Sequence, residues 1–207
     1  MSGIAGSFAR PEPCSRLDGG KSRSRLELPH QPGVAVGSEA TDFELARPSA
    51  GTPVRLSGFR GKQPVVLIFG SYTCPKFRSQ VASLNALFDR FHSRALFLLV
   101  YIREAHPNSS WQSTVNQREG IEQPDAATLD QKRAYAASCL RKLAIKYDAV
   151  VDGIDDAVDR AYQAWPSRVY VIGAQGTVLF NSVLDQLQFD PTVLEKALQS
   201  ELTSPGR

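Results

Sequence analysis

Two continuous apolar segments, separated by a helical pattern, form the strongest feature of the chain. Val65–Phe69 and Ala95–Ile102 have the length and the β-branched and aromatic content of buried strands. The apolar residues between them recur at helical spacing, at Phe77, Val81, Leu84, Leu87, Phe88 and Phe91. Two fully apolar strands joined by a helix are typical of a βαβ unit whose parallel strands are buried on both faces. We therefore predict a parallel βαβ core.

The pattern on either side of this core predicts shorter elements. Gly37–Leu45 indicates a short initial strand, and Pro53–Lys62 a strand followed by a turn. Arg103–Asp130 is a long polar connection, and connections of that length in a compact domain are usually functional. A helix, a short strand, a second helix, two hairpin strands and a closing helix follow, at Leu129–Tyr147, Ala149–Val151, Asp155–Ala164, Arg168–Ile172, Thr177–Phe180 and Pro191–Leu198. This order predicts an α/β thioredoxin-like fold in its peroxiredoxin-like elaboration, with a central mixed sheet flanked by helices.

Composition and charge narrow the class of protein. The length of 207 residues suits one domain with a substantial core. Residues 1–35 are rich in Pro, Gly, Ser and Arg, so we predict a disordered tail ahead of a single domain over residues 36–207. A net charge of +3, spread along the chain, argues against nucleic acid as a partner. No apolar run approaches the roughly 20 residues that cross a bilayer, and the N-terminus lacks a secretory pattern. We therefore expect no membrane partner and a cytoplasmic location.

The cysteines and histidines exclude two kinds of site. Cys14, Cys74 and Cys139 are far apart and odd in number, which argues against a disulfide framework and fits a reducing compartment. The three histidines show no paired spacing with cysteine, so we predict no metal site and no bound cofactor.

Cys74 has the sequence context of a reactive thiol. It follows the predicted strand Val65–Phe69, and Pro75 after it suits the first turn of a helix. The unpaired N–H groups and the dipole at a helix N-terminus stabilise a thiolate, so we predict a lowered pKa for Cys74. The alternative for a single cysteine is an inert, buried side chain, and the strand–Cys–Pro–helix context favours the reactive interpretation.

Two motifs resemble the iodothyronine deiodinase family. Gly70–Phe77 reads G-S-Y-T-C-P-K-F, and Tyr101–Pro107 with Trp111 reads Y-I-R-E-A-H-P followed by W. That family carries G-S-x-T-selenocysteine-P-x-F and Y-I-x-E-A-H-P-x-x-x-W in the same order. The similarity covers roughly residues 54–185, and Asp152–Asp156 belongs to it. The resemblance implies a thiol-dependent oxidoreductase that performs reductive dehalogenation or related thiol-redox chemistry.

The chain also departs from the family pattern. Cys74 stands where the animal enzymes carry selenocysteine, and no counterpart of their second active-site histidine lies between Trp111 and Arg133. We expect no counterpart of their N-terminal membrane anchor. The resemblance therefore implies a cysteine-containing, soluble member with a halogenated, phenol-like substrate. It would use an external thiol reductant, glutathione or thioredoxin.

Within this resemblance, Cys74 is the expected nucleophile. Ser71 or Thr73 could donate a hydrogen bond to its sulfur, or could instead cap the following helix. Arg168 begins a strand expected beside Cys74, where a cation would stabilise a thiolate; the alternative is an exposed strand-end arginine. Pro166 stands where redoxins keep a cis-proline.

The remaining site residues carry two interpretations each. His106 could protonate a leaving carbanion or orient a phenol, or be an inert loop residue. Glu104 could orient His106 or solvate its strand end, and Trp111 could contact substrate or cover the loop. Cys139 could resolve oxidised Cys74 as a disulfide, or be a small buried hydrophobe.

Two other functions stay open at this point. One is a peroxiredoxin-like peroxidase that reduces hydroperoxides through a Cys74 sulfenic acid. The other is a non-catalytic, redoxin-fold binding module. The sequence also leaves the oligomeric state open, a homodimer included.

Overall fold

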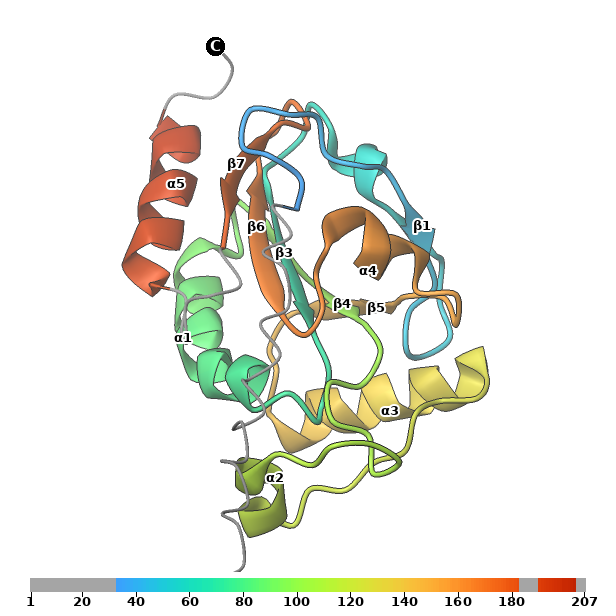
Figure 1. Ribbon diagram of the computed structural model, residues 1–207. Coiled ribbons are helices and arrows are strands. Elements are labelled where there is room, and N and C mark those ends of the chain that lie inside the picture. The colour runs from blue at the N-terminus through green and yellow to red at the C-terminus, as the bar shows by residue number, and fades with distance from the viewer. Residues whose placement is uncertain (1–32, 183–189, 204–207) are drawn as a thin grey trace, which may run out of the picture.

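The computed structural model describes residues 33–182 and 190–203, and a central mixed sheet organises them (Figure 1). The predicted tail, with Cys14, lies outside the described residues except for residues 33–35. The elements in chain order are β1 (Glu44–Leu45), β2 (Val54–Arg55), the 3-10 helix η1 (Leu56–Phe59), β3 (Val65–Gly70), α1 (Pro75–Phe91), β4 (Leu96–Tyr101), α2 (Thr114–Glu119), α3 (Leu129–Lys142), β5 (Asp148–Val151), α4 (Ala157–Tyr162), β6 (Arg168–Ile172), β7 (Val178–Asn181) and α5 (Pro191–Thr203).

The predicted βαβ unit is confirmed and forms the middle of the sheet. Five strands lie in the order β5-β4-β3-β6-β7. β3 runs parallel to β4 and antiparallel to β6, and β6 and β7 form the expected hairpin. β3 is buried along its whole length because both faces of the sheet are covered, as its unbroken apolar sequence predicts.

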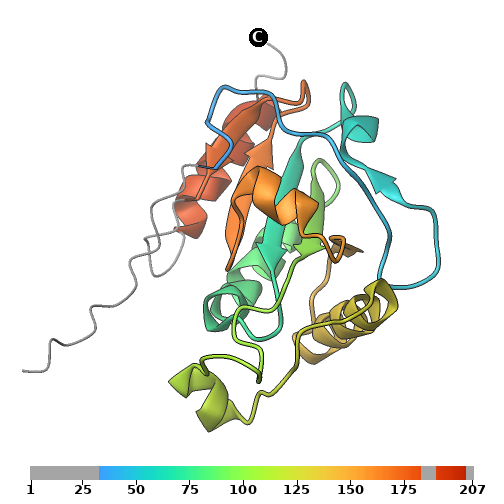
Figure 2. The same ribbon diagram turned by 45° about the vertical axis from the view of Figure 1, so that its right-hand side comes forward.

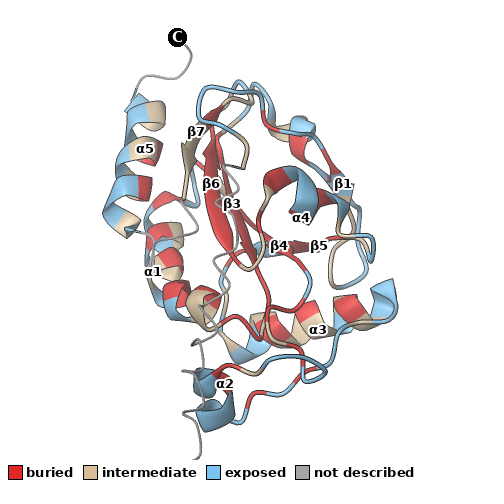
Figure 3. Ribbon diagram, in the orientation of Figure 1, coloured by how far each residue is buried: buried red, intermediate tan, exposed pale blue. Residues whose placement is uncertain are grey.

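Different parts of the chain cover the two faces of the sheet. On one face, side chains of α1, α3 and α5 pack against alternate strand residues such as Val66, Ile68 and Leu99. On the other face, the segment before β3 and helix α4 pack against the intervening residues, such as Leu67, Phe69 and Tyr170. Figure 3 shows the resulting buried stripes on α1, α3 and α5 that face the sheet. Neighbouring strand residues therefore belong to two separate cores.

Several element boundaries differ from the prediction. α3 ends at Lys142 rather than near Tyr147. Ala144, two residues after this end, adopts a positive φ of 49°, which does not continue the helix. α4 begins at Ala157, because the predicted first-turn residue Asp156 also has a positive φ, of 52°. Of the initial strand predicted at residues 37–45, Glu44–Leu45 form β1, and Glu39 makes an isolated bridge to Thr177. None of the helices that the structure describes combines the length and apolarity needed to cross a bilayer.

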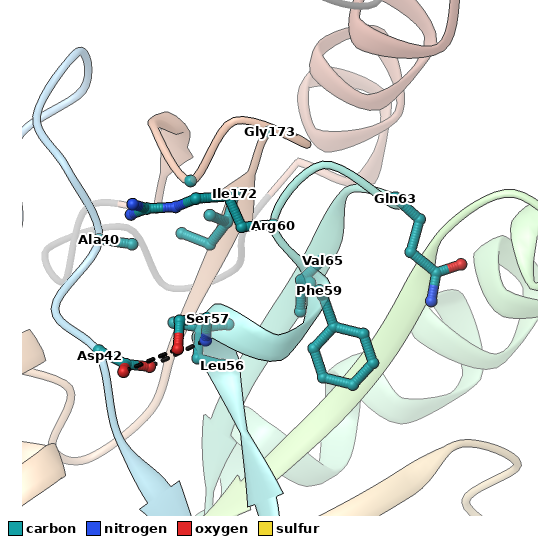
Figure 4. A pocket seen from close by; sticks show the side chains of 11 residues that line it. Ala40, Asp42, Leu56, Ser57, Phe59, Arg60, Gln63, Val65, Ile172 and Gly173 are labelled. Carbon is teal, nitrogen blue, oxygen red and sulfur yellow. Dashed lines mark hydrogen bonds between the residues drawn. The ribbon is translucent and has the colours of Figure 1, made fainter.

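The long connection after β4 contains the unpredicted helix α2 and lies at the end of the sheet where β3 gives way to α1. Figures 1 and 2 both show α2 below the first turns of α1. At the opposite end of β3, a small hollow of about 20 Å³ is lined by Val65, Ile172 and residues of η1, beside the hydrogen bond between Ser57 and Asp42 (Figure 4). That volume holds about one water molecule and is too small for a substrate.

Candidate active site

Cys74 caps the N-terminus of α1, as the sequence predicts. Its backbone is extended, with φ −84° and ψ 106°, and its Sγ accepts a hydrogen bond from the Phe77 amide at 3.4 Å. Gly70, the last residue of β3, allows this close strand-to-helix packing, because a Cβ there would lie 2.4 Å from the Phe77 ring. The local sequence thus places the thiol at the positive end of a 17-residue helix.

The Cys74 thiol is nevertheless buried and neutral in this conformation. Its side chain is 2% exposed. Burial raises the pKa of Cys74 above its ordinary value, and this outweighs the opposing effects of the Phe77 and Lys76 amides and of the Arg78 and Lys76 charges. The prediction of a lowered pKa is therefore wrong. The helix N-terminus does favour the thiolate, but neighbouring segments remove water from the sulfur, and desolvation has the larger effect.

A buried carboxylate holds the residues just ahead of Cys74. Glu104, 5% exposed, accepts hydrogen bonds from the Thr73 amide at 2.9 Å and the Thr73 hydroxyl at 2.6 Å. Its other oxygen accepts from Gln123 at 2.8 Å and from the Tyr101 hydroxyl. Glu104 therefore contacts the His106 segment through the Thr73 hydroxyl, which accepts a hydrogen bond from the His106 amide, and its carboxylate is buried rather than solvated at the strand end. Glu104 joins the two motifs of the sequence into one site.

The hydroxyls of Ser71 and Thr73 connect loops. Thr73 donates its proton to Glu104 and accepts from the His106 amide at 3.1 Å, so that proton is not available to the sulfur. Ser71 accepts from the Ala105 amide at 3.2 Å. The side chain that caps α1 is that of Cys74 itself, so the alternative in which Ser71 or Thr73 caps this helix is wrong. Both side chains fix the loop after β4 against the loop that carries Cys74.

His106 and Trp111 form an aromatic pair at the edge of this loop. Their ring centroids lie 4.7 Å apart at an interplanar angle of 68°. Trp111 is 70% exposed, which does not fit the alternative of a core side chain that covers the loop. Partial burial lowers the pKa of His106 below its ordinary value of 6.5, against the effect of the Trp111 backbone. His106 is therefore a neutral imidazole near pH 7, which suits hydrogen bonding to a phenol better than donation of an imidazolium proton.

We expect Trp111→Ala to raise the pKa of His106 toward 6.5, because the imidazole then gains water while its backbone contacts stay. Proton NMR titration of the His106 ring in both proteins measures this change. The wild-type ring should titrate below pH 6.5. A lower pKa in the variant would contradict the burial argument.

Arg168 lies on the other face of the sheet from Cys74. Its side chain is 2% exposed and donates to the Tyr170 hydroxyl at 3.3 Å, within the core that α4 covers. Val169 and Val171 take the positions facing the α1 side. The structure thus supports neither the thiolate-stabilising role nor the exposed strand-end alternative. Pro166 follows a cis peptide bond, as expected from its position.

Cys139 has the properties of a core residue. It is fully buried in α3, in the same core as Cys74, and both thiols are free. Burial, followed by the negative charge of Glu104, raises the pKa of Cys139 far above its ordinary value. This favours the small buried hydrophobe over the resolving cysteine.

Three residues at the site were missed by the sequence analysis. Arg78 donates to the Tyr72 carbonyl at 2.8 Å, to the Asn116 side chain at 2.9 Å and to the Glu119 carboxylate at 2.7 Å. Asn116 in turn donates to the Thr73 carbonyl at 2.8 Å. Gln123 is the third, through Glu104. A signal for α2 did exist, since a Ser cap and a Gly stop bracket this helix at positions 113 and 120.

An open groove adjoins the first turn of α1. It has a volume of about 680 Å³, and it is lined by Pro75, Lys76, Arg78, Ser79, Val115, Glu119, Ile121 and Leu143. A second cavity of about 290 Å³ lies behind Glu104, between β4, α3 and the loop after β5. The groove starts one residue after Cys74 but does not reach its sulfur. Among the residues that the structure describes, no cluster of His, Cys, Asp or Glu could hold a metal ion.

The order of the elements and the topology of the sheet define a thioredoxin-like fold, with Cys74 at the β3–α1 junction. A putative thiol:disulfide interchange protein DsbE from Chlorobium tepidum is similar, with a TM-score of 0.57 and 18% identity over 82% of this chain and 99% of that one. A secreted Mycobacterium tuberculosis disulfide oxidoreductase gives a TM-score of 0.55 at 16% identity, over 76% of this chain and 95% of that one. At these identities the likeness establishes the fold alone.

The family follows from sequence comparison. The iodothyronine deiodinase model matches residues 25–198, so the chain belongs to the iodothyronine deiodinase family. Thyroxine 5-deiodinase of Gallus gallus is 38% identical over 66% of this chain and 52% of its own length. That of Rattus norvegicus is 30% identical over 70% of this chain and 46% of its own length. The chain thus spans about half the length of these relatives.

Proposed function

We propose that this protein removes iodine reductively from aromatic substrates, with Cys74 as the nucleophile and an external thiol as the reductant. The observation that carries the proposal is the placement of Cys74. It caps α1 within the family's nucleophile motif, and Glu104 of the second motif holds the adjacent residue. Family membership supports the reaction type, and the relatives' names make thyroxine the first substrate to test.

The proposed reaction has three steps, in which two thiols supply the electrons that remove iodine. The Cys74 thiolate attacks iodine of an aryl iodide, the C–I bond breaks, and the ring carbon takes a proton to give the dehalogenated arene and a sulfenyl iodide. A reductant thiol displaces iodide from this sulfur, which gives a mixed disulfide and releases a proton. A second reductant thiol then frees Cys74 by thiol–disulfide exchange. Overall, two thiols become one disulfide, and the aryl iodide becomes an arene and hydrogen iodide.

The site suggests how such a substrate would be held. The groove beside Pro75 combines apolar walls with the cationic side chain of Lys76 and with the Arg78–Glu119 ion pair, which suits an aromatic substrate that carries a negative charge. The His106 imidazole, paired with the exposed Trp111, offers a hydrogen bond and a ring surface for a phenol. Because Cys74 is buried, the segments packed around its thiol must move apart before iodine reaches the sulfur.

Iodide release from thyroxine and from simple iodophenols tests the proposal, with dithiothreitol, glutathione or thioredoxin as the reductant. With at least one combination of substrate and reductant, we expect more iodide release than in the protein-free control. Hydroperoxide consumption under the same conditions serves as the comparison for peroxidase activity. Absence of release with every pair, from folded and fully reduced protein, would refute the proposal.

The burial of Cys74 favours a second candidate function, a non-catalytic redoxin-fold binding module. A thiol that is 2% exposed and has a raised pKa matches an unreactive side chain. Such a module would turn over neither iodinated aromatics nor hydroperoxides. It would also alkylate at Cys74 no faster than an unfolded peptide thiol at the same pH.

We expect the rate of iodide release to rise with pH through and beyond pH 9. The thiolate is the reactive form, and burial places the pKa of Cys74 above its ordinary value of 9.0, so the ionised fraction still increases there. Each pH unit below the pKa costs about tenfold in thiolate. Initial rates at saturating reductant, corrected for the protein-free rate at each pH, measure the profile. A plateau reached below pH 8 would contradict a raised pKa.

A further inference from the structure

Arg78 connects three segments around the nucleophile. Its side chain, 9% exposed, extends from the first turn of α1. One guanidinium nitrogen donates to the carbonyl of Tyr72, two residues ahead of Cys74, and the other donates to Asn116 and Glu119 of α2. These contacts hold the positively charged guanidinium between the Tyr72 carbonyl and α2, and Arg78 itself lies about one helical turn after Cys74. Arg78 also lines the groove beside Pro75.

The charge of Arg78 is opposed by one exposed partner. The Glu119 carboxylate lies 2.7 Å from the guanidinium and is 51% exposed, at the end of the short helix α2. Arg78 acts on Cys74 in the direction that favours the thiolate. Because Glu119 carries the opposite charge and pairs directly with the guanidinium, it offsets part of the Arg78 charge.

Other charged and titratable groups on the elements around Cys74 also contribute to the electrostatic potential there. Helix α1 carries Lys76, and the loop after β4 carries Glu104 and His106. From β4 and α3 come Tyr101, Cys139 and Lys142, the last with its amine over the Tyr72 ring. Among these, Glu104 is committed to Thr73, Gln123 and Tyr101. The Arg78–Glu119 pair differs from the other groups because Glu119 is half exposed. A substitution can therefore remove its charge without disturbing the core.

We propose that the Arg78–Glu119 pair controls how readily Cys74 loses its proton, with Arg78 promoting ionisation and Glu119 restraining it. The inference deepens the proposed function, because it rests on Cys74 being the reacting thiol. It assigns α2 a regulatory role, since any movement of Glu119 away from Arg78 would activate the thiol. It also replaces Arg168, which lies on the other face of the sheet, as the relevant cation.

The directions in which two substitutions change the reactivity of Cys74 distinguish an electrostatic role of the pair from a merely structural one. If Arg78 and Glu119 only fastened α2 to α1, removing either would loosen the same contact and change Cys74 in the same direction. If they act through charge, Arg78→Met must suppress the thiolate and Glu119→Gln must promote it. Arg78→Lys keeps the positive charge but loses the planar guanidinium that donates several hydrogen bonds. If charge is what matters, the Cys74 thiolate should form about as readily in this variant as in the wild type.

The experiment uses the full chain with Cys14→Ser and Cys139→Ala, so that alkylation reports Cys74. The rate with iodoacetamide and the thiolate absorbance are followed from pH 6 to pH 11 in this background and in the three variants. At pH 8 we expect Arg78→Met to alkylate about tenfold slower, and Glu119→Gln about two- to fivefold faster. Glu122→Gln is the matched control, because it removes an exposed acidic charge with no ion pair to Arg78, and it should change the rate less than Glu119→Gln.

The outcomes distinguish the two proposals. Opposed changes in Arg78→Met and Glu119→Gln, without iodide release from any protein, would leave this inference intact and refute the proposed function. Changes of the same sign, or a Glu119→Gln rate equal to that of Glu122→Gln, would overturn the inference whether or not iodide is released. If Arg78→Met fails to fold by circular dichroism, the comparison of Glu119→Gln with Glu122→Gln decides.

Discussion

Cys74→Ser is expected to abolish thiol-dependent iodide release, with a loss of more than about 10³-fold, to the rate of the reductant alone. Both steps that follow the attack need sulfur, since the sulfenyl iodide and the mixed disulfide have no serine counterpart that the reductant could resolve. The substitution is nearly isosteric at a helix N-cap, where serine is itself favoured, so the fold should persist. Iodide release and circular dichroism together separate loss of chemistry from loss of structure.

Cys139→Ala provides the control for this experiment. Cys139 is fully buried in α3, so its removal should cost about 1 kcal/mol of stability through a small cavity and leave iodide release within about twofold. A Cys139→Ala protein that accumulates a glutathione adduct and stops turning over would restore the resolving role. Iodide release by Cys74→Ser above the reductant rate would remove Cys74 from the mechanism.

Glu104→Ala is expected to destabilise the fold by about 4 kcal/mol and to expose Cys74. The change leaves the Thr73 amide and hydroxyl, the Gln123 amide and the Tyr101 hydroxyl without their buried acceptor. A buried donor left without a partner costs about 1–3 kcal/mol, and relaxation with water entry recovers part of the sum. The loop over Cys74 should then open, so the thiol should alkylate faster at a given pH although its helix position is unchanged.

Urea denaturation gives the stability change, and the alkylation rate at pH 8 gives the exposure of Cys74. Glu122→Ala is the matched control, because Glu122 is exposed beside the same loop and should cost less than about 0.5 kcal/mol. A Glu104→Ala protein as stable as this control would show that the network contributes little to the fold. Slower alkylation in Glu104→Ala would contradict the view that Glu104 keeps the sulfur covered.

The sequence was most informative where the pattern is local. The uninterrupted apolar run at residues 65–69 and the helical spacing after it predict β3 and α1, because a strand buried on both faces must be apolar throughout. Pro75 then fixes the start of α1 and makes Cys74 its cap. The hairpin of β6 and β7 follows from two short apolar runs around Gly176, whose φ of 88° suits glycine.

The prediction failed where distant segments decide the outcome. Burial raises the pKa of Cys74, and the core in which the thiol is buried includes Ala105 and, from α3, Cys139, which lie more than 30 positions later in the sequence. The orientation of Arg168 depends on strand parity, since Val169 and Val171 had to face α1 and Arg168 therefore faces the other core. Arg78 was overlooked because a charged residue within an amphipathic helix is ordinary until α2 is known to lie beside it.

The most direct test of the account is a single turnover with the reduced protein, an iodophenol in slight excess and one equivalent of glutathione, so that no second thiol is left to free Cys74. The proposal predicts one dehalogenated product per protein and an equal amount of glutathione on the Cys74 peptide by mass spectrometry. Dehalogenated product without modification of Cys74, or an adduct at Cys139 alone, would contradict the assignment of Cys74 as the atom that takes the iodine.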